Sequence, residues 1–188
     1  MQNFTTDITQ CLEILQNGGI ILYPTDTIWG LGCDATNEAA IEKIITLKKR
    51  APSKSFVVLV SDEKEVMKYV AAIDLSVFDY LNLQTKPTTV IYNNAIGFPD
   101  NIVAADGSIA IRICKDDFCK TLIKRFRKPI VSTSANFSNE PSPKIFNDID
   151  NELKKGVDYI VQHRQDDTTL AEPSSIIKWE NGNIISIR

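Results

Sequence analysis

Neutral hydrogen-bond donors are concentrated in one short stretch, residues 132–136, with the sequence Ser-Thr-Ser-Ala-Asn. It directly follows the apolar pair Ile130-Val131, which predicts that a buried strand ends here. Hydroxyl and amide groups, together with backbone N–H groups that point the same way in a turn, suit an anion such as a phosphate. Open α/β sheets bind ligands outside the carboxyl ends of their strands, so the position also fits a site. The alternative is an ordinary polar loop whose hydroxyls cap the next turn.

A second polar cluster follows another apolar strand. Residues 20–23, Ile-Ile-Leu-Tyr, run into Pro24 and then into Thr25, Asp26 and Thr27. The proline interrupts the strand ladder, and small hydroxyls and a carboxylate come after it. The glycines at positions 30 and 32 are expected to permit backbone turns that other residues resist.

Cations gather in two segments of a chain whose net charge is −3. Residues 43–54 contain five basic side chains and no acid, and residues 112–128 contain seven against two acids. The charge is local, which favours a confined anion site over a surface that coats nucleic acid. A solvated helix face is the alternative. The helix dipole accounts for Lys48 and Arg50 at a helix end, but it does not account for Lys54, which lies beyond the helix.

Several chemistries are excluded by what the sequence lacks. There is no Gly-x-x-x-x-Gly-Lys-Ser/Thr and no Gly-x-Gly-x-x-Gly motif. With a single histidine, His163, neither a zinc site nor a histidine-based triad is expected. The four cysteines form no Cys-x-x-Cys pair and lie in apolar surroundings, which predicts buried free thiols. The remaining cations and neutral donors suit chemistry run by positioning and charge neutralisation, as in transfer at a nucleotide phosphate.

The elements that must position these residues alternate between helix and strand patterns. Helices are expected after Asp7 as N-cap, after residues 36–37, after Asp116, and across residues 145–153. Strands are expected at 20–23, 56–60, 88–92, 108–113, 130–131 and 157–161, with a terminal hairpin at 174–187. Residues 162–173 are polar and are interpreted as a mobile flap. The prediction is one α/β domain over residues 1–188, a twisted mixed sheet with flanking helices.

Length and composition agree with a single globular domain. The chain has 188 residues, 43% of them hydrophobic and 24% charged. No apolar run approaches the roughly 18 residues that span a bilayer. The first seven residues lack the pattern of a signal peptide. The chain is therefore expected to be cytoplasmic and not associated with a membrane.

Five segments in order resemble the YrdC/Sua5/TsaC family of threonylcarbamoyl-AMP synthases. The resemblance extends from about residue 8 to 188. The segments are Tyr-Pro-Thr-Asp-Thr-Ile-Trp-Gly-Leu-Gly-Cys-Asp at 23–34, Lys-x-Arg at 48–50 with Lys54, Pro-Thr-Thr at 87–89, Ser-Thr-Ser-Ala-Asn at 132–136 and Pro-Ser-Ser-Ile at 173–176. The resemblance implies a twisted open sheet with a basic concave cavity. It also implies formation of threonylcarbamoyl-adenylate and pyrophosphate from L-threonine, bicarbonate and ATP.

The resemblance also implies roles for individual residues. Lys48 and Arg50 would be catalytic, and Mg²⁺ would be carried by the ATP phosphates with no dedicated metal site in the protein. Threonine would be bound by Thr25, Asp26, Thr27 and Arg112, with a structural role as the alternative for Asp26 and an interior ion pair as the alternative for Arg112. ATP would be bound by Lys48, Arg50, Lys54, Ser132, Ser134, Asn136, Ser174 and Arg188.

The partners implied are separate proteins that transfer the threonylcarbamoyl group to adenosine 37 of tRNA, giving t6A. A weak direct tRNA contact is left open. This chain departs from the family where Gln-Thr-Lys at 84–86 replaces the usual Trp-Pro-Gly, where Trp29 replaces tyrosine, and at Ser55. The alternative function is a YciO-like protein or an RNA-binding module of the same fold without synthase activity.

Overall fold

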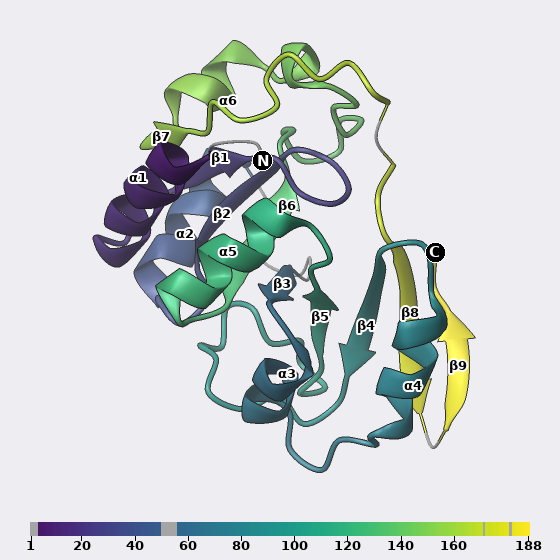
Figure 1. Ribbon diagram of the computed structural model, residues 1–188. Helices are drawn as coiled ribbons and strands as arrows, with labels where there is room; N and C mark the ends of the chain where they lie inside the picture. Colours follow the sequence, from purple (N-terminus) through teal and green to yellow (C-terminus); the bar gives the residue numbers. More distant parts are fainter. Residues whose placement is uncertain (1–3, 50–55, 171, 181) are drawn as a thin grey trace.

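Nine strands pair into one mixed sheet in the computed structural model, which describes residues 4–49, 56–170, 172–180 and 182–188 (Figure 1). The order across the sheet is β7-β1-β2-β6-β3-β5-β4-β8-β9. The strands are β1 Ile21–Tyr23, β2 Gly30–Asp34, β3 Val57–Val60, β4 Thr88–Tyr92, β5 Ile109–Ile113, β6 Ile130–Ser134, β7 Tyr159–Ile160, β8 Ser175–Glu180 and β9 Asn183–Ser186. The expected α/β class with a mixed sheet is confirmed.

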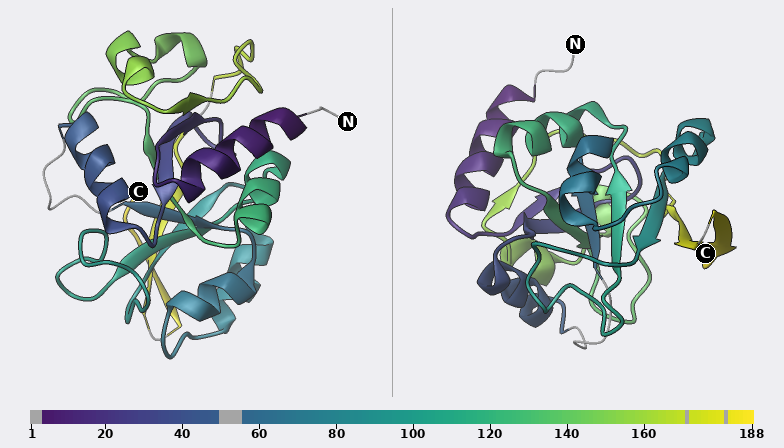
Figure 2. Two further views of the ribbon diagram at one scale, coloured as in Figure 1. Left: turned by 90° about the vertical axis from the view of Figure 1, so that its left-hand side faces the viewer. Right: turned by 90° about the horizontal axis from the view of Figure 1, so that it is seen from below.

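Helices lie on both sides of this sheet. They are α1 Thr5–Gln16, α2 Glu38–Leu47, α3 Glu63–Tyr69, α4 Ser76–Leu83, α5 Asp117–Phe126, the 3₁₀ helix η1 Phe146–Asp148 and α6 Asn151–Lys155. Helices α1, α3, α4 and α5 lie on one side and α2 on the other (Figure 2). No helix in the described parts of the chain is long and apolar enough to cross a membrane.

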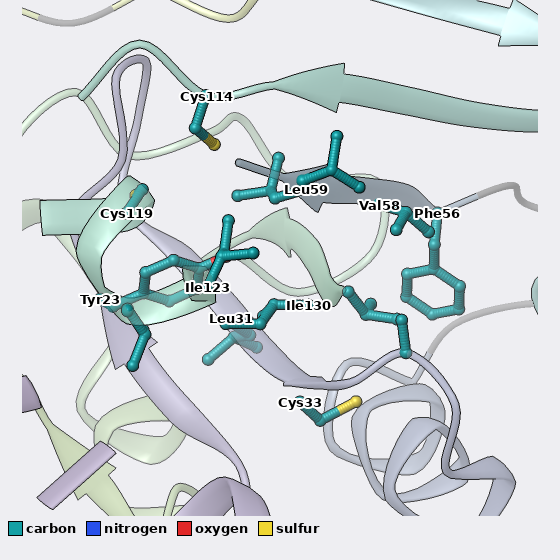
Figure 3. Close-up of a cluster of buried hydrophobic side chains, with 14 of the residues drawn as sticks. Tyr23, Leu31, Cys33, Phe56, Val58, Leu59, Cys114, Cys119, Ile123 and Ile130 are labelled. Carbon is teal, nitrogen blue, oxygen red and sulfur yellow. The ribbon is translucent and has the colours of Figure 1, made fainter. Parts of the chain in front are cut away.

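The core extends over both faces of the central strands. Figure 3 shows buried residues of four neighbouring strands and Ile123 of α5; Tyr23, Leu59 and Ile130 share one face of the sheet, and Leu31 and Val58 lie on the other. All of these side chains are buried. Helix α5 presents Phe118, Leu122 and Phe126 to the interior at a helical spacing, and Asp116 caps its first turn by accepting from the Cys119 N–H (2.8 Å), as expected. This packing fixes the strands whose ends carry the polar clusters.

Three local expectations are wrong. Asp7 does not cap α1, because the helix begins at Thr5 and the Asp7 carboxylate instead accepts hydrogen bonds from residues near β7. Residues 145–153 do not form one helix, because they divide into η1 and the short α6. Gly30 and Gly32 lie inside β2 and do not form turns. They matter because the absence of a side chain leaves room for neighbouring residues.

Candidate functional site

The hydroxyls of the 132–136 stretch lie on a strand, not after it. Strand β6 continues through Ser134, and Ser132 pairs with Gly32 of β2 and Val57 of β3. Since side chains alternate along a strand, Ser132 and Ser134 face the same side of the sheet. Arg112 shares that side, because Leu59 pairs with both Ile130 and Arg112. The register therefore brings two predicted donors and a predicted cation together.

Glycine in β2 leaves room for these hydroxyls. Gly30 pairs with Ser134, and a Cβ at Gly30 would stand 3.0 Å from Ser132 Oγ and 3.2 Å from the carbonyl oxygen of Thr133. Both distances are tighter than almost all real Cβ contacts. Any larger residue would push against the strand that carries the hydroxyls, so the glycine is required by close approach.

An inner cavity of about 250 Å³ opens above these strands. None of the described residues whose side chains line it is acidic. Seven predicted site residues line it, and these are Thr25, Thr27, Arg112, Ser132, Ser134, Ser174 and Arg188. Two arginines and several hydroxyls, without a carboxylate, make this cavity suitable for an anion.

An outer cavity of about 800 Å³ continues from the inner one. The two share Thr25, Thr27, Pro173, Ser174 and Arg188. Asp26 lines only the outer cavity, together with Lys86, Arg164, Asp167 and Glu172. Positive and negative side chains are therefore mixed in the outer part, whereas the charged side chains that line the inner part are all positive among the residues that the structure describes.

The polar residues at the end of β1 form a tight turn that is tied to β5. Thr25 Oγ1 donates to the carbonyl oxygen of Ile28 (2.8 Å) and accepts from the Thr27 N–H (3.0 Å). Asp26 forms an ion pair with Arg112 at 3.0 Å, and both side chains are more than nine-tenths buried. Burial lowers the pKa of Arg112, but Asp26, together with the neighbouring Cys114, Cys119 and Tyr23, raises it by more, so the guanidinium stays charged.

One donor of Arg112 remains available. Its Nε is buried without a hydrogen-bond partner among the described residues. Burying an unpaired donor costs about 1–3 kcal/mol, which an acceptor on a ligand would offset. Arg112 therefore makes the interior ion pair and also lines the inner cavity, and its binding of a ligand stays a prediction.

Residues 162–170 and 172–173 lie between β7, at one end of the sheet, and β8, near the other end (Figure 1). Their beginning is fixed, because Asp7 accepts from the backbone N–H groups of Gln162 and His163 (both 2.9 Å). Arg164 donates to Asp116 (2.8 Å) and to the carbonyl oxygen of Thr25 (3.4 Å). This segment forms one wall of the outer cavity. Its role as a flap stays a prediction.

Lys48 lies beside the site and not in it. The side chain is 1% exposed at the end of α2. Its ammonium group donates to the carbonyl oxygens of Ser134 and Asn136, the first at 2.5 Å. Asn136 uses its amide N–H₂ on the carbonyl oxygens of Phe137 (2.9 Å) and Glu140 (2.7 Å). Both side chains therefore stabilise the turn after β6, and neither lines the described cavities.

Two predicted cations, Arg50 and Lys54, lie outside the described residues. Sequence reasoning missed other lining residues: Trp29, Thr133, Ser142 and Arg164. Arg164 has a left-handed backbone (φ 64°) within a polar segment, and no sequence pattern marks its side chain as part of a site. The departure at Lys86 does concern the site, because this lysine lines the outer cavity.

The cysteines are free and buried, as expected. Burial raises the pKa of Cys11 and Cys33, so neither is a ready nucleophile. Among the residues that the structure describes, no cluster of three or more His, Cys, Asp or Glu side chains could hold a metal ion.

Comparison with known proteins agrees with this arrangement. The profile of the Sua5/YciO/YrdC family, described as telomere recombination, matches residues 13–188. A Methanocaldococcus jannaschii protein is 38% identical over 176 residues, 94% of this chain and 81% of its own length. A Coxiella burnetii protein named threonylcarbamoyl-AMP synthase is 34% identical over 145 residues, 75% of this chain and 76% of its own length.

Among solved structures, Sua5 from P. abyssi complexed with L-threonine superposes with a TM-score of 0.86. The superposition covers 97% of this chain but only 54% of that chain, at 19% identity. At this identity the likeness shows the fold alone, which is the fold expected from the sequence. The profile match and the sequence relatives go further: this chain belongs to the Sua5/YciO/YrdC family.

Proposed function

We propose that this protein is a threonylcarbamoyl-AMP synthase, which forms L-threonylcarbamoyladenylate and pyrophosphate from L-threonine, bicarbonate and ATP. The observation that carries the proposal is the inner cavity, where strand hydroxyls and two arginines meet without a carboxylate. The name of the Coxiella relative supports the same activity. The alternative of a related fold without synthase activity is not favoured, because no feature of the site supports it over the activity named for that relative.

The reaction brings three anionic groups together. The amine of threonine attacks bicarbonate, water leaves, and the carbamate oxygen then attacks the α-phosphorus of ATP, so that pyrophosphate departs. No covalent nucleophile on the protein is required. The protein supplies positioning and fixed positive charge, which act where negative charge develops in the transition state. Charges held in place before the reaction cost no reorganisation during it.

We assign the inner cavity to phosphate groups. Ser132 and Ser134 project into it from β6, and Arg188 closes it from the carboxyl end of the chain. Arg188 donates to the Ser174 carbonyl oxygen through Nε and Nη2 (3.3 and 3.1 Å), which orients its guanidinium. Thr89 holds the Ser174 hydroxyl at 2.8 Å. Ser174 and Arg188 therefore form one bonded unit at this wall.

We assign the junction of the two cavities to threonine. Thr27 lines both, and Arg112 offers its unpaired Nε–H to a carboxylate oxygen. Asp26 completes a buried pair with Arg112, so its main effect is to hold the guanidinium in place. In this assignment Arg50 and Lys54 remain predicted cations for ATP, and Lys48 acts by fixing the turn at residues 134–136.

Magnesium would arrive on the triphosphate. Mg²⁺ usually keeps several waters and is bound through substrate phosphates with few protein oxygens. Carboxylates at the outer cavity, Asp167 and Glu172, are the side chains that could face it. Transfer to tRNA by downstream proteins, a weak tRNA contact and a cytoplasmic location also stay predictions.

The decisive assay follows pyrophosphate release with radiolabelled threonine. Release should require threonine and bicarbonate together, and a labile labelled adenylate should form. ATP turnover that continues unchanged without threonine would contradict the proposal. Ser132→Ala should lower kcat/KM about fivefold, the worth of one neutral hydrogen bond of about 1 kcal/mol. Ser138→Ala is the matched control, because Ser138 lies after the same strand and lines neither cavity.

A further inference from the structure

A third cavity lies on the opposite side of the sheet from the inner cavity. Its walls are the end of β3, the first turn of α3, the last turn of α4 and the segment that leads from β5 into α5. Ile113 lines it, whereas the preceding Arg112 lines the inner cavity. Likewise Thr88 lines it, whereas Thr89 contacts Ser174. Because consecutive strand residues face opposite sides, the sheet separates this cavity from the inner cavity, whereas Lys86 lines both this cavity and the outer cavity.

The position is one where α/β proteins bind ligands. Strands β3 and β5 are parallel, and the cavity lies at the carboxyl ends of both. Ligands of open α/β sheets bind outside the carboxyl ends of parallel strands. The cavity volume is about 390 Å³. Binding sites for small organic molecules range over roughly 300–1,000 Å³. Size and placement both fit a small molecule.

The described side chains that line this cavity carry more positive than negative charge. Both lining carboxylates are engaged: Asp62 caps α3 by accepting from the Glu65 N–H (3.1 Å), and Glu63 accepts from Asn82 (3.2 Å). Of the four lining lysines, only Lys115 is bonded through its amine, to the carbonyl oxygen of Gln84.

The other three, Lys64, Lys86 and Lys120, form no hydrogen bond or ion pair with the residues that the structure describes. Lys120 is half-buried and lines the cavity.

The cavity also has an apolar part, formed by Leu81 and Ile113. We infer that it binds a small organic anion, a carboxylate or phosphate carried on an apolar body. The anion would contact Lys120 and its neighbouring amines, and the body would cover Leu81 and Ile113. The argument for this site uses neither threonine nor ATP, and of its lining residues only Lys86 also lines the outer cavity.

Phenyl phosphate is a suitable probe, because it joins an anion to an apolar ring. In NMR titrations of the methyl-labelled protein, the Leu81 and Ile113 methyl signals should shift until the site is saturated, and both should give the same dissociation constant. The Ile176 methyl group, which lines the inner cavity, reports separately on binding at the candidate site. Shifts confined to Ile176 would overturn the inference.

Two lysines one turn apart on α5 provide the matched pair. Lys120→Gln should raise the dissociation constant of phenyl phosphate about tenfold, because a charge-assisted hydrogen bond is lost. The constant is measured from the Leu81 and Ile113 methyl signals. Lys124→Gln should leave the affinity unchanged, since Lys124 is exposed and lies outside the cavity.

Benzylamine, which has the ring and the opposite charge, should not saturate these signals. Equal binding of benzylamine, or equal weakening by both substitutions, would refute an anion site.

Discussion

Replacing Lys48 with methionine tests whether a buried ammonium group holds the turn after β6. Methionine keeps most of the length and apolar volume of the side chain and removes only the charge and its donors. Two carbonyl oxygens, those of Ser134 and Asn136, would lose their partner. Hydrogen bonds to charged groups contribute about 1.5–3 kcal/mol each, and the methionine recovers part of the loss through apolar contact. We expect a net cost of about 2–4 kcal/mol.

The cost can be measured directly as thermal and chemical stability. For a chain of this size each kcal/mol lowers Tm by about 2–4 °C, so Lys48→Met should melt about 4–16 °C below the unsubstituted protein. Pyrophosphate release should fall as well, because Ser134 lines the inner cavity. Lys49→Met is the control, since Lys49 is exposed and its amine lies only over the Phe137 ring, at 5.2 Å. It should cost less than about 1 kcal/mol.

One outcome would refute this reasoning. If Lys48→Met melts within about 1 °C of the unsubstituted protein but loses turnover, then the amine does not stabilise the turn. It would instead act on the substrate, which is the catalytic role that the sequence resemblance implies.

Three further substitutions follow from the geometry. Gly30→Ala should lower the free energy of unfolding by about 1–3 kcal/mol through overpacking, as urea titrations would show. Turnover per folded molecule should fall as well, in activity assays, because the added methyl group pushes against the strand that carries the hydroxyls. Cys33→Ala should lower the free energy of unfolding by about 1–2 kcal/mol through a core cavity and leave turnover per folded molecule nearly intact; a thousandfold loss would reveal a missed nucleophile. Asp26→Asn should cost about 3–5 kcal/mol because it leaves Arg112 as a buried unpaired charge, and the double variant with Arg112→Met should be less destabilised than the sum of the two.

The sequence predicted the sheet better than the site. Apolar runs such as 57–60 and 88–92 form buried strands, because their period and β-branched side chains are local properties. The mistaken N-cap at Asp7 shows the limit of local reasoning. Its carboxylate accepts from Tyr159, Gln162 and His163, which lie about 150 positions along the chain. Nothing near Asp7 in sequence signals these partners.

The role of Lys48 was hidden for a similar reason. A lysine at a helix end is ordinarily explained by the dipole or by a ligand. Its burial depends on the approach of residues 134 and 136, which α2 does not determine. Arg164 was missed because a polar stretch gives no periodicity from which to place a side chain. The hydroxyls of Ser132 and Ser134 were found because residue type alone indicated their chemistry.

The pairing of early strands with late ones has a consequence for how the chain is made. Strand β1 pairs with β7 through Ile21 and Tyr159, and β4 pairs with β8 through Thr88 and Ser175. During synthesis both early strands emerge well before their partners, and unpaired strand edges are templates for association with other chains. The segment that carries β8 and β9 leaves the ribosome after β4 and brings Ser174 and Arg188, which line the inner cavity. A nascent chain that lacks it therefore has an uncovered β4 edge and an incomplete anion site.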